Sequence, residues 1–294
     1  MNIAPFEYHA PRTIEEAVAL LNNGGKKAFA MAGGTDLLIK ARQKIVRPAI
    51  VVALKKIKGL NRIAVDEDQG LTIGATALLS EVAAHPLILE RYPAVAEAAA
   101  GTANVQIRNM GTVVGNLCNA SPSADNAPTL VAMEACLHIA GPDGSRTLPL
   151  QDFFKGPGLT ALNTAEIVTA VQVPPPPPNA GTSYRSLSAR GAVDCAAVCV
   201  AAMVIVNNKR LQKVRLCVGA CASTPVRTPQ AETLLAGKTL SEKRLAAAAD
   251  QASRETLPIS DVRASSAYRR RVVSVLVRRA VVRAVERAQP SNTA

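Results

Sequence analysis

The chain has 294 residues, of which 48% are apolar, so the sequence excludes a disordered chain and does not require disulfide staples. Aromatic residues make up only 3% and tryptophan is absent, which predicts a core of aliphatic and alanine side chains between helices and sheets. The formal net charge of +12 suggests nucleic acid as a partner, but few aromatic side chains are available to stack on bases.

The first third of the chain predicts helices that alternate with short strands. Thr13 and Glu16 form a capping-box pattern, which opens a helix that continues to about residue 21. A buried strand over residues 27–31 is followed by two glycines, Gly33 and Gly34. The next predicted elements are a helical stretch over 36–43, strands over 49–54 and 71–75, a short helix capped by Ser80 and an alanine-rich helix over 93–100.

Five consecutive prolines at positions 174–178 divide the remaining elements into two groups. A proline run favours polyproline II and cannot join the interior of a sheet, so we interpret it as a domain boundary. Before it come a helix over 126–135, with Pro128 in its first turn, and strands over 137–140 and 167–173. After it come a hairpin, with strands over 194–206 and 210–220, and helices over 229–235, 241–256 and 265–288.

The last predicted helix accounts for half of the excess charge. Between Asp261 and Ala294, eight arginines stand against two acidic residues. The arginines flank apolar residues at helical spacing, namely Val272, Val273, Leu276, Val277, Val281 and Val282. This pattern favours an amphipathic helix whose basic face meets solvent or another subunit over a stripe that binds nucleic acid.

The chain shows no sign of secretion or of a membrane span. The N-terminus lacks the pattern of a signal peptide, and the most apolar segment, residues 192–206, is too short to cross a bilayer. We therefore expect a soluble, cytoplasmic protein with reduced and mostly buried cysteines. Cys195 with Cys199 and Cys217 with Cys221 are each spaced by four in predicted strands, about 13 Å apart, so neither pair alone can bind a metal.

The segment Ala32–Asp36 is the first of two loops that could bind a ligand. Gly33 and Gly34 follow a predicted strand and allow the backbone to approach a ligand closely. The helix that follows presents free N–H groups and the positive end of its dipole, which suits a pyrophosphate. By itself this pattern is equally compatible with a tight strand-to-helix turn that binds nothing.

The second loop is Gly111–Asn116, and it continues to Asp125 through small hydroxyl and amide side chains. Asp125 offers only acceptors at neutral pH, so a carboxylate facing sugar or ribityl hydroxyls is one use for it, and capping of the next helix is the alternative. No lysine or arginine occurs from Asn109 to Ser145. We therefore expect amides and hydroxyls to neutralise a dinucleotide here, as suits a permanently held cofactor.

Other short patterns carry no function. Residues 236–239 look like part of a P-loop, but Glu232 stands where that motif requires its first glycine. The three histidines, His9, His85 and His138, have neither triad nor metal spacing. We therefore predict no catalytic residue and no metal ligand in this chain.

Taken together, four segments resemble the FAD-binding subunits of the xanthine dehydrogenase and carbon monoxide dehydrogenase family of molybdenum hydroxylases. The resemblance covers essentially the whole chain in order. Two positions depart from the family pattern: Val114 replaces a second glycine, and Arg185 replaces a lysine, which leaves the role of residue 185 open. The segments that carry it are Ala32–Asp36, Ile107–Asn109 before Thr112, Gly115–Pro122 with Asp125, and Phe153–Gly158.

The resemblance implies an α+β fold without a Rossmann domain. It implies an FAD-binding domain over residues 1–176, with subdomains of about 1–56 and 57–176, and a C-terminal domain over 177–294 with a three-stranded antiparallel sheet and a helical bundle. The cofactor would be non-covalent FAD. Carried over by position, its binding residues would be Phe29, Ala30, Met31, Ala32, Gly33, Gly34, Thr35, Asp36, Gly111, Thr112, Val113, Val114, Gly115, Asn116, Asp125, Ile167 and Tyr184.

The resemblance also implies a role in a larger enzyme. A large subunit with the molybdenum cofactor would oxidise the substrate, and a small 2Fe–2S subunit would pass electrons to the FAD, which would hand them to NAD or another acceptor. The expected assembly is a dimer of heterotrimers. The alternative is a stand-alone flavin oxidase of the same wider fold class, which would need a substrate pocket and catalytic bases of its own.

Overall fold

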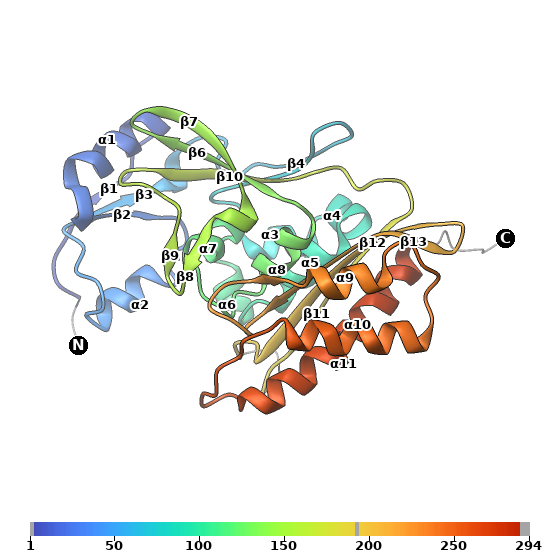
Figure 1. Ribbon diagram of the computed structural model, residues 1–294. Helices are drawn as coiled ribbons and strands as arrows, with labels where there is room; N and C mark the ends of the chain where they lie inside the picture. The colour runs from blue at the N-terminus through green and yellow to red at the C-terminus, as the bar shows by residue number, and fades with distance from the viewer. Residues whose placement is uncertain (1–2, 192–193, 289–294) are drawn as a thin grey trace.

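The computed structural model describes residues 3–191 and 194–288, and Figure 1 shows how their elements are arranged. Four sheets organise these residues, and the strands of each sheet come from one part of the chain. Three short 3-10 turns, Gly25–Lys27, Leu54–Lys56 and Leu150–Asp152, join neighbouring elements. None of the described helices is both long enough and apolar enough to cross a bilayer.

The N-terminal sheet is parallel, with the order β1-β3-β2, and its strands are β1 (Glu7–His9), β2 (Ala28–Met31) and β3 (Ile50–Ala53). Helix α1 (Ile14–Gly24) packs against β2 and β3 through Ala17, Val18 and Leu21. The Thr13 hydroxyl caps it by accepting from the Glu16 N–H at 3.1 Å, as the sequence predicts. Helix α2 (Leu37–Arg42) follows β2 after the glycine pair.

The second sheet is antiparallel, with the order β4-β5-β10-β6-β7. Its strands are β4 (Ile63–Asp66), β5 (Gly70–Gly74), β6 (Cys136–Gly141), β7 (Gly144–Pro149) and β10 (Ile167–Val173). A small hairpin, β8 (Phe154–Gly156) with β9 (Leu159–Thr160), lies beside it. The helices between β5 and β6 are α3 (Leu79–Ala84), α4 (Pro86–Arg91), α5 (Pro93–Gly101), α6 (Val105–Arg108), α7 (Val113–Cys118) and α8 (Asn126–Ala132).

The start of α3 corrects one prediction. Ser80 lies inside this helix and does not cap it. The helix begins earlier because the Leu79 N–H donates to the Gly111 carbonyl at 3.0 Å, and because Leu78 forms an isolated bridge with Thr112. The Glu81 carboxylate then accepts from the Leu78 N–H at 2.9 Å. A long-range contact therefore sets this boundary.

The C-terminal sheet is antiparallel, with strands β11 (Ala180–Leu187), β12 (Val198–Asn207), β13 (Arg210–Gly219) and β14 (Val226–Arg227). The expected three-stranded sheet is thus extended by a two-residue fourth strand. The hairpin between β12 and β13 turns at Asn208 and Lys209, which both have positive φ, as in a type I′ turn. The helices of this half are α9 (Pro229–Leu235), α10 (Glu242–Arg254) and α11 (Ser266–Ala288).

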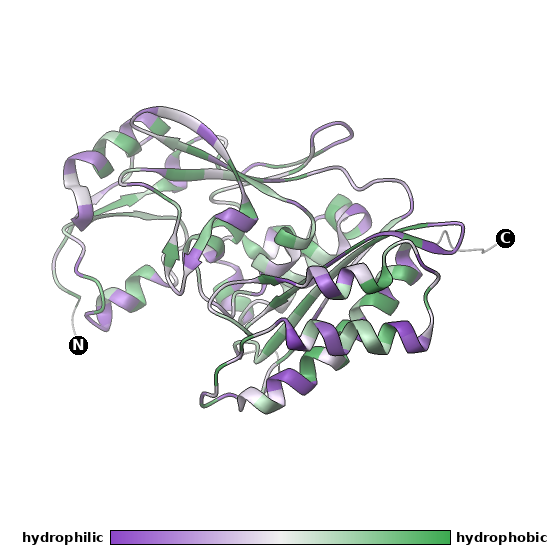
Figure 2. Cartoon of the chain, in the orientation of Figure 1, coloured by the Kyte–Doolittle hydropathy of each residue, from purple (hydrophilic) through white to green (hydrophobic). Residues whose placement is uncertain are grey.

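Both faces of the C-terminal sheet are buried, which explains the long apolar run of β12. Val198, Val200, Ala202 and Val204 pack against the side of α9, α10 and α11. Cys199 and Ala201 point the other way and join the large core of the first half of the chain, where α5 and α8 cover the sheet. Figure 2 shows these strands as a largely hydrophobic layer between helices.

Side chains from two helices hydrogen-bond to the free edge of β11. The Arg287 guanidinium of α11 donates to the Thr182 carbonyl at 2.8 Å. The Glu97 carboxylate of α5 accepts from the Tyr184 N–H at 2.9 Å, and Arg287 donates to Glu97 at 2.6 Å. One ion pair thus satisfies backbone groups at the centre of this edge.

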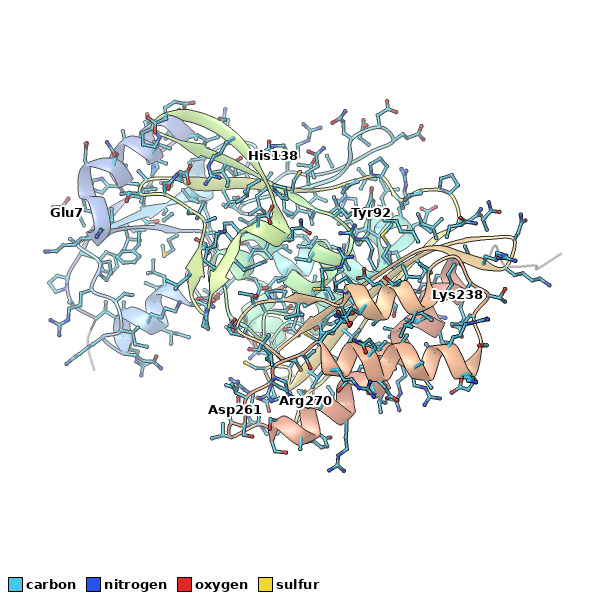
Figure 3. All side chains as sticks on the ribbon, in the orientation of Figure 1. Glu7, Tyr92, His138, Lys238, Asp261 and Arg270 are labelled. Atoms are coloured by element: carbon cyan, nitrogen blue, oxygen red, sulfur yellow. The ribbon has the colours of Figure 1, made fainter. Side chains whose placement is uncertain are left out.

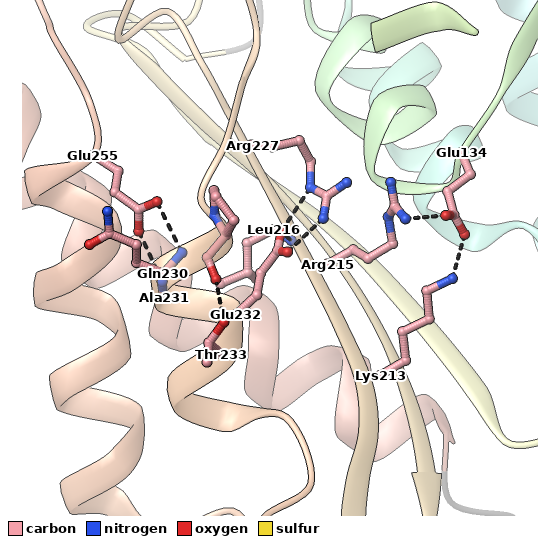
Figure 4. Close-up of polar contacts among 11 residues, drawn as sticks. Glu134, Lys213, Arg215, Leu216, Arg227, Gln230, Ala231, Glu232, Thr233 and Glu255 are labelled. Carbon is pink, nitrogen blue, oxygen red and sulfur yellow. Dashed lines mark hydrogen bonds and ion pairs between the residues drawn. The ribbon is translucent and has the colours of Figure 1, made fainter.

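A second polar contact joins the two halves of the chain (Figure 4). Glu134, just after α8, accepts hydrogen bonds from Arg215 and, at 2.6 Å, from Lys213 of β13. Beside it, Arg227 donates to both carboxylate oxygens of Glu232 at 2.8 and 2.5 Å. The pairs of Glu134 with Lys213 and Arg215 join the two halves, whereas the pair of Arg227 and Glu232 lies within the C-terminal half.

Candidate functional site

The fold brings the two glycine loops into direct contact. A Cβ added at Gly33 would lie 2.2 Å from the Met110 carbonyl oxygen and 2.8 Å from the Gly111 Cα. No side chain fits between these backbones. The first loop, Ala32–Asp36, therefore lies against the start of the second loop, Gly111–Asn116.

The first loop has backbone donors that the protein does not use. Gly33, Gly34 and Thr35 donate no backbone hydrogen bond within residues 3–191 and 194–288. Gly34 has a φ of +73°, a conformation that glycine adopts without strain. Helix α2 begins only at Leu37 and has six residues, so its dipole is small. The consecutive free N–H groups, more than the helix, suit an anion such as a pyrophosphate.

The second glycine segment is a loop only at Gly111 and Thr112, because helix α7 (Val113–Cys118) begins at its third residue. The prediction of a loop over Gly111–Asn116 is therefore wrong for most of its length. The segment divides into a buried part and an accessible part. Residues 111–114 are buried, and the Thr112 hydroxyl caps α7 by accepting from the Gly115 N–H at 2.9 Å. Gly115 and Asn116 are partly exposed. A ligand could therefore reach the Gly115–Asn116 end, while Gly111–Val114 shape the loop and pack on its neighbours.

The loop after α7 is fastened to α2 by a network that the sequence did not predict. The Asn119 amide donates to the Asp36 carboxylate at 2.9 Å, and its oxygen accepts from the Lys40 ammonium at 2.6 Å. Burial raises the pKa of Asp36, and the charge of Lys40 partly opposes this. The amide-and-hydroxyl site expected from residues 109–145 thus acquires a cation from a distant part of the chain. No local pattern signals this contact, because Lys40 and Asn119 are 79 positions apart in the sequence.

Asp125 does not cap helix α8, so the helix-cap alternative is wrong. It occupies the N-cap position with helical backbone angles, and its side chain caps no N–H group. It accepts a hydrogen bond of 2.7 Å from the Tyr184 hydroxyl instead. Burial raises the pKa of Asp125 to about 6, while the bond from Tyr184 lowers it. Burial likewise raises the pKa of Tyr184 well above its usual value.

Asn116 lies close to this pair through its neighbour Asn126. The Asn126 amide donates to the Asn116 side-chain oxygen at 3.1 Å and to the Thr102 hydroxyl at 3.0 Å. The Asn126 side-chain oxygen is buried and has no partner in the described part of the chain. Small polar groups with unused hydrogen-bonding capacity thus surround Asn116, which suits a ligand rich in hydroxyls.

The loop of residues 119–125 is supported from two sides. The Gly158 N–H donates to the Ala120 carbonyl at 2.9 Å, and the Ala220 N–H donates to the Pro122 carbonyl at 2.8 Å. The first bond comes from the Phe153–Gly158 segment and the second from the C-terminal sheet. Two further segments therefore hold this loop in place.

The resemblance to the FAD-binding subunits also concerns Ile167 and Arg185. Ile167 is 4% exposed on β10, a strand that α7 contacts, so its contact with a cofactor stays a prediction. Arg185 lines a groove of about 450 Å³ with Arg278, Arg279 and other residues of α10 and α11. It lies 3.8 Å from Glu97. This groove is not lined by either glycine loop, so we assign it no part in the site.

The described residues offer little other chemistry. No group of three histidine, cysteine, aspartate or glutamate side chains in them could hold a metal ion. His138 is hydrogen-bonded to Gln172 at 2.8 Å, and His9 lies 3.3 Å from Glu7, so both have structural partners. The site thus combines backbone N–H groups that have no partner among the described residues with amides, hydroxyls and one buried carboxyl, groups that can bind the phosphates and hydroxyls of a ligand.

Comparison with known proteins finds two family matches that together cover most of the chain. Residues 4–176 match a family described as the FAD binding domain in molybdopterin dehydrogenase, and residues 182–284 match the CO dehydrogenase flavoprotein C-terminal domain.

Among curated relatives, the chain is 31% identical to the carbon monoxide dehydrogenase medium chain of Hydrogenophaga pseudoflava, over 94% of this chain and 96% of the relative. It is also 31% identical to the xanthine dehydrogenase FAD-binding subunit of Escherichia coli O157:H7, over 96% of each. A solved carbon monoxide dehydrogenase from H. pseudoflava, which lacks the Mo-pyranopterin moiety, has a TM-score of 0.94 at 32% identity, covering 98% of this chain and 99% of the other.

Proposed function

The chain belongs to the FAD-binding subunits of the molybdopterin dehydrogenase family, and from that membership we propose that it takes electrons from an iron–sulfur chain and passes them to NAD or another acceptor. Its relatives are dehydrogenase subunits, so it is part of an oxidoreductase. When bound, FAD supplies the exchange between one-electron and two-electron transfer, and the protein binds and orients it. We likewise propose that the chain consists of an FAD-binding domain over residues 1–176 and a C-terminal domain over residues 177–294, and that the enzyme is cytoplasmic.

The observation that best supports this function is a cradle of free backbone N–H groups at Gly33, Gly34 and Thr35, where the two glycine loops meet. The free N–H groups of Gly33, Gly34 and Thr35 suit a pyrophosphate. Because Gly33 has no side chain, its backbone can lie directly against Met110 and Gly111. Lys40 lies beside this cradle through its bond to Asn119 and would offset part of the phosphate charge.

We propose further roles for the residues around the cradle. Asn116 and Asp125 would bind hydroxyl groups of the dinucleotide, and Tyr184 would lie beside the flavin ring while it orients Asp125. Ile167 would contact the flavin from β10. The proposed binding residues are Phe29, Ala30, Met31, Ala32, Gly33, Gly34, Thr35, Asp36, Gly111, Thr112, Val113, Val114, Gly115, Asn116, Asp125, Ile167 and Tyr184.

We propose that the partners are a large chain with the molybdenum cofactor and a small 2Fe–2S chain, assembled as a dimer of heterotrimers. Relatives named as medium chains and FAD subunits support a multi-chain enzyme. The site holds one buried carboxyl and no histidine in either glycine loop, which supports cofactor binding over substrate oxidation by this chain alone.

The test compares the co-expressed complex with this chain alone, each loaded with FAD and mixed rapidly with substrate under anaerobic conditions. We expect flavin bleaching near 450 nm in the complex. In the isolated chain, which has no partner to supply electrons, bleaching should be slower by at least a factor of about 1,000, which corresponds to about 4 kcal/mol of barrier. Equal rates would establish a stand-alone oxidase. A chain purified from the complex without FAD would contradict the function itself.

A further inference from the structure

The loop between α10 and α11, together with the first turn of α11, carries four exposed large apolar side chains within residues 257–268. Leu257 is 75% exposed, Ile259 is 69% exposed and Val262 is fully exposed. Tyr268, in the first turn of α11, is 49% exposed. We call these four residues the Leu257 surface; Figure 1 shows the loop at the lower edge of the C-terminal half. Apolar side chains gathered on one exposed segment typically mark a site of contact with another molecule.

Buried hydrogen bonds fix the shape of this loop. Arg269 is 2% exposed and donates to the carbonyls of Ala197 and Ala220 at 2.6 and 2.8 Å. It also donates to the Asp261 carboxylate at 2.6 Å, and Asp261 accepts from the Arg263 N–H at 2.8 Å. A loop held in this way cannot turn its apolar side chains inward, so their exposure is built into the fold.

The loop is connected to the candidate cofactor site by two backbone hydrogen bonds. The Leu257 N–H donates to the Cys221 carbonyl at 2.9 Å, and the adjacent Ala220 N–H donates to the Pro122 carbonyl at 2.8 Å. Pro122 lies in the loop that ends at Asp125. The segment that carries the Leu257 surface is therefore joined to the loop that we assign to the cofactor through Ala220 and Cys221.

We propose that the Leu257 surface is where the iron–sulfur chain docks. This inference rests on the proposed function and adds the place of contact. An electron donor has to approach the cofactor closely, and the segment that carries this surface is joined to the cofactor loop. An apolar centre with a polar rim is typical of a specific interface. The rim is basic, since Arg263, Arg270 and Arg271 are exposed around it, so the partner presents an apolar patch with acidic neighbours. Figure 3 labels Arg270 and Asp261 on this part of the molecule.

The test uses the complete complex, co-expressed and purified through a tag on this chain. The variant combines Ile259→Ser and Val262→Ser, and the matched control combines Leu87→Ser and Leu89→Ser, which are 42% and 53% exposed on α4. Native mass spectrometry at decreasing concentration gives the point at which half of the iron–sulfur chain has dissociated. We expect this concentration to rise at least tenfold in the variant and to stay unchanged in the control.

Flavin content and the rate of flavin reduction complete the test. We expect wild-type FAD content in the variant and, at concentrations where the complex is intact, a wild-type rate of reduction by substrate. The proposal is overturned if the iron–sulfur chain stays bound as tightly as in the wild type, if the molybdenum chain alone dissociates, or if the variant loses FAD. A wild-type complex without FAD would instead refute the proposed function.

Discussion

The Tyr184 hydroxyl donates a hydrogen bond of 2.7 Å to the Asp125 carboxylate, and so ties the first strand of the C-terminal sheet to the loop that follows α7. Both side chains are buried. Tyr184→Phe removes the donor and leaves Asp125 without it, so we expect a loss of about 1–3 kcal/mol in the unfolding free energy of the FAD-free chain. Asp125→Ala should weaken FAD binding more than Tyr184→Phe does, because it also removes the acceptor for ligand hydroxyls. Denaturant titration and flavin fluorescence measure the two effects. Equal losses of FAD affinity in both variants would show that Asp125 acts only through Tyr184.

The raised pKa of Asp125, about 6, predicts a pH dependence of stability. Its unfolded pKa is near 3.9, so the folded state holds this proton more tightly. The contribution to stability is full below about pH 4 and is lost as the pH rises through about 6, by roughly 3 kcal/mol in total. Asp125→Asn removes this titration. We expect the difference in unfolding free energy between the variant and the FAD-free wild type to grow in favour of the variant from pH 4 to 7. A constant difference over this range would contradict the assignment.

Gly34→Val should strip FAD from the purified complex. Gly34 has a φ of +73°, and a Cβ there would lie 3.0 Å from the Met31 sulfur, so the variant should distort the cradle. The left-handed backbone also costs about 1–2 kcal/mol with a side chain. Gly237→Val is the matched control, since Gly237 has a φ of +74° and open space around it. Flavin absorbance per chain measures occupancy. If both variants lose FAD to the same extent, general destabilisation is the cause.

Asn119 and Lys40 should be energetically coupled in FAD binding. Their bond of 2.6 Å fastens α2 to the loop after α7, so Asn119→Ala and Lys40→Met should each weaken FAD binding, by roughly tenfold. Because either change breaks the contact between Lys40 and Asn119, the double variant should lose less affinity than the sum of the two single losses. Fluorescence titration of the three apo variants with FAD gives the cycle. Fully additive losses would show that the two residues act independently.

The FAD should be bound non-covalently. Cys118 is the only cysteine or histidine in the loops that we assign to the cofactor, and burial raises the pKa of its thiol to about 12, so it offers little thiolate for attachment. Acid precipitation of the purified complex should therefore leave the yellow cofactor in the supernatant. Flavin that stays with the precipitated chain after washing would refute this prediction.

The sequence predicted the fold class and the strand pairs that have clear alternation or turn signals, and it missed features that depend on distant contacts. The β12–β13 hairpin and the Thr13 cap follow from local chemistry. The boundary at Leu79 depends on Gly111, and the pairing of Asp125 with Tyr184 spans 59 positions. The short elements β1, α4, α6 and β14 have too few residues to show a periodicity. Several proposed site residues follow from short motifs, whereas Lys40 became visible only in three dimensions.

The ion pair of Glu97 and Arg287 on the edge of β11 has a consequence for how the chain meets other chains. An open edge strand can pair with a strand of another molecule and so start aggregation. Here two helices occupy the N–H of Tyr184 and the carbonyl of Thr182, the groups that an incoming strand would need. The chain is thereby protected at this edge against pairing with another strand, and this protection is lost if the ion pair is broken.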